Sequence, residues 1–167
     1  IARLMQEAGL NVPRVLAWDE AAGFLLLSDL GTRTLIEVLD RERPQANQDL
    51  YLQALDALLA WQRASRPGVL PPYDAALLQR ELALFPDWYL TRHRGVAVDG
   101  TLRETLDAAF ATIVARNLAA PCVYVHRDFM PRNLMAPAGA VNGGLGVLDF
   151  QDAVYGPITY DIASLMR

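Results

Sequence analysis

The sequence predicts an α+β fold that is mostly helical, with a small β portion. Long helical patterns occupy the middle of the chain, above all at 45–64 and 101–118, where apolar residues recur at helical spacing. Strand patterns are confined to the two ends. Two extended apolar segments lie within 12–28, and shorter apolar runs at 122–125 and 145–148 are each followed by polar residues.

Composition narrows the kind of protein. The chain has 167 residues and is 53% hydrophobic, enough for one sizeable core, or for one domain and part of another. Its net charge of -4 disfavours binding to nucleic acid or to an anionic membrane. No apolar run approaches the roughly 20 residues that span a bilayer, and no leader is visible, so we expect a cytoplasmic protein. The single Cys122 excludes an internal disulfide and predicts a buried, reduced thiol.

The N-terminal segment begins with a helical pattern that runs to Ala8, and Gly9 is placed to end it. Segments 12–18 and 23–28 predict two strands joined by a polar turn. The second strand leads into a short extended connection at 28–31, before the helical part of the chain begins.

The middle of the chain predicts four helices with different surroundings. Thr32 or Thr34 is a candidate cap for the first. The second carries a wide apolar stripe that includes Trp61, which predicts a core helix. Pro86 is expected to interrupt the helical path after the third. The predicted helices are 34–39, 45–64, 74–84 and 101–118.

Polar groups follow the two short strands near the C-terminus. Asp128 and Asn133 come after the strand at 122–125, and Asp149 comes after the strand at 145–148. Transfer of a phosphoryl group to an alcohol needs a carboxylate that orients the hydroxyl, and oxygen ligands that hold Mg²⁺ against phosphates. Asp128 suits the first task, while Asn133 and Asp149 suit the second. Taken alone, Asp128 could instead cap a turn.

The pattern His126-x-Asp128-x-x-x-x-Asn133, followed by Asp149-Phe150, resembles the catalytic and metal loops of the protein-kinase-like fold. Gln151 stands where protein kinases have glycine, which points to the small-molecule branch. With the continuation to Leu165, the chain resembles the aminoglycoside phosphotransferase and choline kinase superfamily. More narrowly, it is similar to bacterial anomeric sugar kinases of N-acetylmuramate and N-acetylglucosamine.

This resemblance implies a domain plan, cofactors and a function. Residues 1–30 would be a remnant of the β-sheet nucleotide-binding N-lobe with its hinge, and 31–167 a helical C-lobe, truncated at its C-terminus, that carries both loops. The cofactors would be ATP and Mg²⁺. The reaction would be ATP-dependent phosphorylation of a small-molecule hydroxyl, here the anomeric hydroxyl of an amino sugar in cell-wall recycling. The oligomeric state stays open.

The resemblance also implies roles for individual residues. Backbone groups of Ser28, Asp29 and Leu30 would pair with adenine, although an ordinary strand-to-helix connection explains this segment equally well. His126 would be structural rather than a proton shuttle. Asp161 would accept backbone N–H groups of the catalytic loop, or else complement a helix dipole.

Four residues are candidate contacts to sugar or phosphate. Arg132 could stabilise charge on a moving phosphoryl group or pair with Asp152 on the surface. Arg80, Glu81 and Trp88 lie in the segment where the resemblance places acceptor-binding helices. The alternative is a packed Trp88 and a surface Arg80.

Two further functions compete with the sugar kinase. An aminoglycoside- or choline-type kinase shares the chemistry, but segment 74–94 balances three acidic residues with three arginines, so no acidic patch for a polycation appears. The second competing function is a non-catalytic, kinase-like binding protein. Such a protein would be expected to lack Asp128, Asn133 or Asp149, and the presence of all three counts against it.

The sequence contains no lysine, and all 15 basic residues are arginine. Kinases of this fold use a strand lysine, commonly after a glycine-rich loop, to hold the nucleotide phosphates. We therefore expect the sequence to be an internal piece of a longer enzyme, and the 167 residues alone to be inactive.

Overall fold

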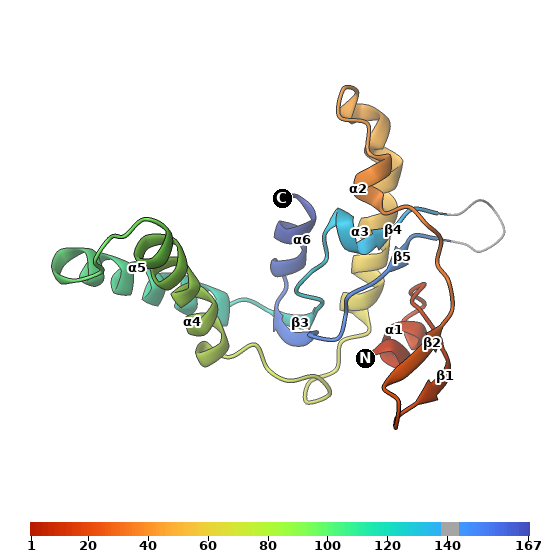
Figure 1. Cartoon of the computed structure of the whole chain (residues 1–167), viewed down its shortest axis with the longest axis horizontal. Coiled ribbons are helices and arrows are strands. Elements are labelled where there is room, and N and C mark those ends of the chain that lie inside the picture. The colour runs from red at the N-terminus through yellow and green to blue at the C-terminus, as the bar shows by residue number, and fades with distance from the viewer. Residues whose placement is uncertain (138–143) are drawn as a thin grey trace.

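The structure is a computed structural model that describes residues 1–137 and 144–167. Figure 1 shows three parts. A central body holds the long helix α3 and the C-terminal helix α6, a two-helix arm containing α4 and α5 extends to one side, and a β-hairpin with helix α1 lies on the other. Within the described residues, no helix is long and apolar enough to cross a membrane.

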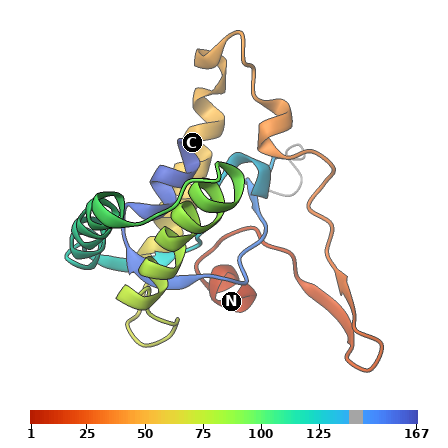
Figure 2. The same ribbon diagram turned by 60° about the vertical axis from the view of Figure 1, so that its left-hand side comes forward.

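The N-terminal part consists of α1 (Ala2–Glu7) and a hairpin. Gly9 follows the helix at φ 83°, a left-handed conformation that glycine adopts without steric cost. Strands β1 (Val15–Asp19) and β2 (Phe24–Leu27) pair antiparallel, as the sequence predicts, and both are shorter than predicted. Figure 2 shows this hairpin projecting from the body, and every residue of both strands is exposed.

The next part is a pair of helices that rises above the body in Figure 2. Thr34 caps α2 (Leu35–Val38) in a reciprocal capping box with Glu37. A short 3₁₀ turn, η1 (Pro44–Asn47), leads into α3 (Gln48–Arg63). The predicted apolar stripe of α3 faces the core. Its buried residues are Ala54, Leu58 and Trp61.

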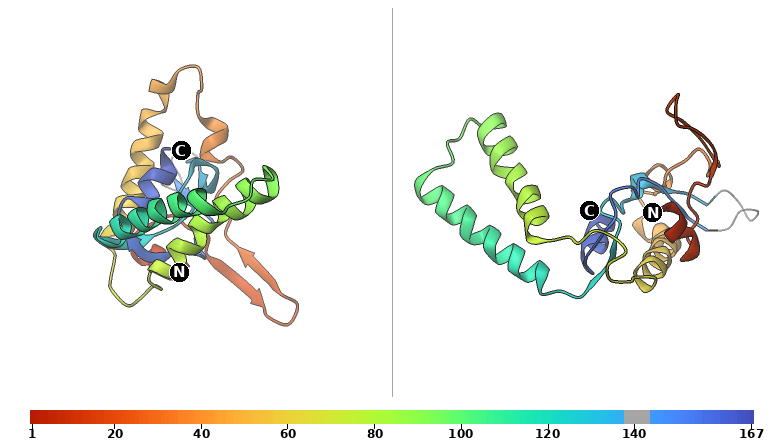
Figure 3. Two further views of the ribbon diagram at one scale, coloured as in Figure 1. Left: turned by 90° about the vertical axis from the view of Figure 1, so that its left-hand side faces the viewer. Right: turned by 90° about the horizontal axis from the view of Figure 1, so that it is seen from below.

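The arm consists of α4 (Ala75–Leu84), η2 (Phe85–His93) and α5 (Gly100–Leu118). Asp74 caps α4 by accepting the N–H of Leu77 at 2.9 Å. The α-helix ends at Leu84, just before Pro86, as predicted. The chain does not leave the helical path there, however, but continues as a wider, π-helical segment. Figure 3 shows α4 and α5 reaching away from the body.

The body contains an antiparallel pair of strands between two hydrophobic clusters. Strand β3 (Cys122–Val125), predicted with these bounds, pairs with β6 (Val154–Pro157). Tyr124 packs in the cluster that includes α3, while Val125 packs in the cluster that includes α4 and α5. The expected burial of Cys122 is wrong, because it lies at the exposed first position of β3.

A second, very short ladder lies beside this pair. The 3₁₀ turn η3 (Pro131–Asn133) leads directly into β4 (Leu134–Met135), which pairs antiparallel with β5 (Gly146–Val147). Helix α6 (Tyr160–Leu165) follows β6 and packs in the body. The loops after β3 and β5 therefore leave the body on a rigid, buried framework.

Candidate active site

The loop after β3 begins in the fully buried part of the molecule. His126 and Asp161 are both 0% exposed. The Asp161 carboxylate, in the first turn of α6, accepts the backbone N–H of His126 at 2.7 Å and that of Arg127 at 3.0 Å. Burial raises the pKa of Asp161 to about 6, although the two backbone bonds oppose this shift. Helix α6 therefore holds the first turn of the loop through one carboxylate.

His126 fixes the next peptide of the loop. Its Nδ1 accepts the backbone N–H of Asp128 at 3.2 Å. Burial lowers the pKa of His126 to about 4, against the raising effects of the Leu148 backbone and the Asp149 charge. The ring is therefore neutral near pH 7, with its proton on Nε2. A neutral, buried ring bound to backbone orients the loop and is poorly placed to shuttle protons.

The side chain of Asn133 joins the two loops. Its Nδ2 donates to the backbone carbonyl of Asp128 at 2.9 Å and to Oδ2 of Asp149 at 3.3 Å. The backbone supports this arrangement, since the Leu148 N–H donates to the Asn133 carbonyl at 2.9 Å. Asp128 is partly buried and Asp149 is exposed. The structure thus brings together the three residues that the sequence singled out, from loops sixteen residues apart.

Two loop residues have strained backbones. Arg127 (φ 78°) and Asp149 (φ 62°) both occupy the left-handed region, although neither is glycine. Such conformations persist only where the surroundings hold them, and they cluster at functional sites. Asp149 is held by Asn133 and by Gln151, whose Nε2 donates to Oδ1 at 2.7 Å.

The donor set around Asp149 suits a hard cation. Both side-chain hydrogen bonds of Asn133 use Nδ2, so Oδ1 is available as a ligand within the part of the chain that the structure describes. Over the same residues, no three His, Cys, Asp or Glu side chains lie close enough together to hold a metal ion between them. One amide oxygen and one carboxylate fit Mg²⁺, which completes its shell with water and phosphate, better than they fit zinc.

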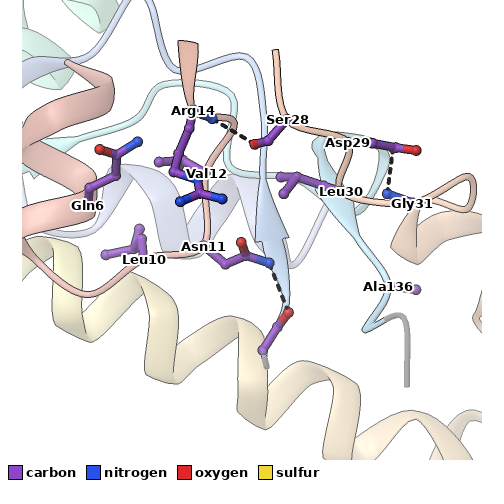
Figure 4. A pocket seen from close by; sticks show the side chains of 11 residues that line it. Gln6, Leu10, Asn11, Val12, Arg14, Ser28, Asp29, Leu30, Gly31 and Ala136 are labelled. Carbon is purple, nitrogen blue, oxygen red and sulfur yellow. Dashed lines mark hydrogen bonds between the residues drawn. The ribbon is translucent and has the colours of Figure 1, made fainter. Parts of the chain in front are cut away.

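A cavity of about 400 Å³ lies between α1, the end of β2 and the β4–β5 ladder (Figure 4). Ser28, Asp29 and Leu30 all line it. Ser28 is bound to the backbone of Arg14 through its N–H and its Oγ, both at 2.9 Å. By contrast, the backbone groups of Asp29 and Leu30 make no hydrogen bond within residues 1–137 and 144–167. They are available to a planar ligand with hydrogen-bonding edges.

The cavity lies apart from the three polar residues of the two loops, and the β4–β5 ladder links the two places. Within the described residues, neither Asp128, Asn133 nor Asp149 lines the cavity. The β4–β5 ladder joins the two places, because Ala136 lines the cavity and Asn133 precedes β4. Three residues of extended chain span about 10 Å. An elongated ligand could therefore lie along the ladder, with one end in the cavity and the other beside Asp149.

The candidate acceptor residues on the arm have different surroundings. Glu81 is partly buried and binds Arg127 of the catalytic loop, with Nη2 to Oε1 at 2.5 Å. Arg80, next to it, is exposed. Trp88 is 56% exposed on η2, and the guanidinium of Arg92 lies 3.9 Å from the centre of its ring. Of the three, Glu81 alone contacts the catalytic loop in the part of the chain described.

Arg132 is exposed on η3 and makes no ion pair in the described part of the chain, so the alternative of a pairing with Asp152 is not observed there. It lines a groove between α2 and α6.

Sequence reasoning missed Tyr73, Arg127 and Tyr160, which surround Glu81. The sequence held one indication of this cluster, the arginine at position 127 beside Asp128. A partly buried arginine needs an acidic partner, although the sequence does not say which one.

Comparisons with known proteins decide the family. A profile of the phosphotransferase enzyme family matches residues 1–167. The chain belongs to this family. Two solved structures resemble it: aminoglycoside-3'-phosphotransferase of type VIII (TM-score 0.63, 15% identity, 99% of this chain and 61% of that chain) and a choline/ethanolamine kinase family protein from Mesorhizobium loti (0.61, 17%, 98% and 52%). At these identities they establish the fold, and the expected protein-kinase-like class is confirmed.

Curated relatives share more of the sequence. An N-acetylmuramate/N-acetylglucosamine kinase of Pseudomonas aeruginosa is 49% identical over 167 residues, which cover 100% of this chain and 47% of the relative. A protein of the same name from Neisseria meningitidis is 44% identical over 158 residues, 94% of this chain and 46% of the relative. The resemblance drawn from the motifs is thus confirmed, and the chain spans about half the length of these relatives.

Proposed function

We propose that the protein containing these residues is an ATP- and Mg²⁺-dependent kinase that phosphorylates the anomeric hydroxyl of an amino sugar. N-acetylmuramate and N-acetylglucosamine are the proposed acceptors, since the most similar of the relatives compared carry those names. The structural observation that carries the proposal is the Asn133 side chain, which joins the Asp128 backbone to the Asp149 carboxylate. We place the reaction in the cytoplasm, as part of cell-wall sugar recycling.

Asp128 is the proposed catalytic residue. Its backbone is fixed on both sides, by His126 at the N–H and by Asn133 at the carbonyl. Its carboxylate makes no hydrogen bond within the described residues and is partly buried. It can therefore accept a hydrogen bond from the acceptor hydroxyl, orient it towards the phosphate and take its proton. Phosphoryl transfer depends mainly on such positioning.

Asn133 and Asp149 are the proposed metal ligands, through Oδ1 and the carboxylate respectively. Bound Mg²⁺ supplies positive charge beside the nucleotide phosphates. The chain's own part is to hold the two oxygens at one place, which the hydrogen bond between the two side chains favours. Gln151 orients the far oxygen of Asp149.

Ser28, Asp29 and Leu30 are the proposed adenine contacts. The unpaired backbone groups of Asp29 and Leu30 support this role, as does their place in the cavity wall (Figure 4). Leu30 also lies against Gly146 of the β4–β5 ladder. A Cβ at Gly146 would lie 3.0 Å from Leu30 Cδ1 and 3.0 Å from Met135 Cβ, so a side chain there would push the hinge from the ladder.

The test is a kinase assay on the full-length protein with a panel of acceptors: N-acetylmuramate, N-acetylglucosamine, choline and kanamycin. We expect turnover of one or both sugars with ATP and Mg²⁺, and a product that has lost its reducing end, since the anomeric hydroxyl is consumed. Asp128→Asn should lower kcat by roughly 10²- to 10⁴-fold, the range for general-base catalysis.

Glu104→Gln on the exposed face of α5 is a suitable control and should leave kcat unchanged. Turnover of kanamycin or choline in place of the sugars would replace the substrate assignment and keep the chemistry. Nucleotide binding without turnover of any acceptor would favour a non-catalytic binding protein.

A further inference from the structure

The Glu81 carboxylate on α4 is held by side chains from three other segments. Arg127 of the catalytic loop donates to Oε1 at 2.5 Å. The hydroxyl of Tyr73, from the segment before α4, donates to Oε2, and that of Tyr160, at the start of α6, lies 3.4 Å from the same oxygen. The two tyrosine rings meet edge to face, with centroids 5.3 Å apart. Both carboxylate oxygens are therefore engaged inside the protein.

The surroundings strengthen this contact. The side chains of Arg127 and Glu81 are 25% and 27% exposed, so water screens the pair less than a surface ion pair. Burial raises the pKa of both Tyr73 and Tyr160. Both phenols therefore stay protonated near pH 7 and can donate to the carboxylate. A charge-assisted pair with such added donors has a defined geometry.

Arg127 is held at two points, one in the body and one on the arm. Its backbone N–H is bound by Asp161, and its side chain is bound by Glu81. Between these ties its backbone takes the left-handed conformation, at φ 78°. Asp128 is the next residue, so its direction depends on that conformation being kept. Removal of one tie allows Arg127 to relax towards an ordinary conformation and turns Asp128 with it.

Glu81 also belongs to the arm. Leu78 of α4 and Val114 of α5 pack in one cluster with Val125, directly before the catalytic loop. The apolar contact holds the arm against β3, and the Glu81–Arg127 pair adds a directional link between the arm and the loop.

We propose that Glu81 is a positioning residue which, through Arg127, sets the direction of the Asp128 carboxylate. This inference rests on the proposed function, in which Asp128 is the catalytic base. It also replaces the expectation that Glu81 binds the sugar directly, because both of its oxygens are engaged by Arg127, Tyr73 and Tyr160.

The kinetic test uses the full-length protein with Glu81→Gln, Arg127→Gln, the double variant and the control Glu104→Gln. Misplacing a catalytic group by about 1 Å costs on the order of a hundredfold in rate. We expect Glu81→Gln to lower kcat roughly ten- to a hundredfold and to leave the KM for ATP unchanged. The double variant should be no slower than the slower single variant, since the pair acts as one unit.

Three results would overturn the inference. A direct sugar ligand would raise the acceptor KM at constant kcat, and a purely structural residue would lower Tm while the folded enzyme kept its kcat. Additive losses in the double variant would likewise show that Glu81 and Arg127 act apart.

A second measurement separates this inference from the proposed function. Hydrogen exchange of the peptide 126–133 reports the fixing of the loop whether or not any acceptor is turned over. We expect faster exchange in Glu81→Gln than in the parent and in Glu104→Gln. If the parent phosphorylates nothing in the panel, the proposed function fails and exchange alone decides whether Glu81 holds the loop; unchanged exchange refutes it.

Discussion

Two antiparallel strand pairs of similar composition have opposite surroundings in this molecule. In β3, Tyr124 and Val125 are each 1% exposed. In the β1–β2 hairpin, Leu16 is 58% exposed and Phe24 is 72% exposed. Both pairs are short and rich in apolar residues, so strand propensity does not distinguish them. The difference lies in what packs over each pair.

The surroundings of β3 explain why the catalytic loop is fixed. The ring of Trp61 on α3 lies 4.7 Å from that of Tyr124, and Ser65 accepts the Tyr124 N–H at 2.7 Å. Asp161 then binds the first two amides beyond the strand. The strand that carries the site is thus held on its faces and at its end, whereas the β1–β2 hairpin is held mainly by its own ladder.

The largest expected difference between the two regions concerns their aspartates. Asp161→Ala leaves two buried N–H groups without an acceptor and should lower the free energy of unfolding by about 4 kcal/mol. Asp19→Ala removes one exposed bond, to the Ala22 N–H in the β1–β2 turn, and should cost about 0.5 kcal/mol. Urea denaturation of the full-length protein measures both. Equal losses would contradict the comparison.

The next prediction concerns pH, because two buried groups beside β3 titrate in opposite senses. His126 has a pKa of about 4 in the fold against 6.5 unfolded, so its contribution to stability is lost as pH falls from 6.5 to 4. Asp161 has a pKa of about 6 against 3.8, so its contribution is lost as pH rises from 3.8 to 6. Each amounts to about 3 kcal/mol, and in the parent they nearly cancel.

His126→Asn keeps an acceptor for the Asp128 N–H and removes one of the two titrations. The stability difference, parent minus variant, should therefore grow by about 3 kcal/mol between pH 4 and pH 6.5. Denaturation curves at several pH values test this. A difference that is constant with pH would show that His126 does not titrate as its burial requires. No such trend is expected for substitutions in β1–β2.

A smaller effect comes from matched valines in the two strand pairs. Val125→Ala removes two buried methyl groups from β3 and should cost about 2 kcal/mol. Val15, in β1, is 56% exposed, so Val15→Ala should change the free energy of unfolding by less than about 0.5 kcal/mol. Thermal unfolding of both variants gives the comparison. A cost at Val15 equal to that at Val125 would mean that another part of the full-length protein covers the hairpin.

The sequence predicted local features well, because local chemistry determines them. The bounds of β3 follow from an apolar run that ends at a histidine, and the start of α2 follows from Thr34, one of the two candidate caps. The convergence of Asn133 and Asp149 was also predicted from the motif. In the structure Asn133 directly precedes β4 and Asp149 follows β5, and antiparallel pairing places those two ends side by side.

Features that depend on distant partners were not predicted. The Glu81–Arg127 pair joins residues 46 positions apart, and nothing near either residue specifies the other. Cys122 is exposed because its strand begins at the surface, which an apolar run does not reveal. The α-helix ends before Pro86 as expected, but its continuation as a wider, π-helical segment was not predicted, because hydrophobic spacing does not distinguish that form.

The two-rung β4–β5 ladder acts as a spacer of fixed length between the cavity at Leu30 and the paired side chains of Asn133 and Asp149. Asp149 follows β5 after a single residue, so one residue inserted between Val147 and Asp149 would move the carboxylate away from Asn133. The geometry of this region therefore depends on chain length as well as on residue type, and an insertion here should do more harm than most substitutions.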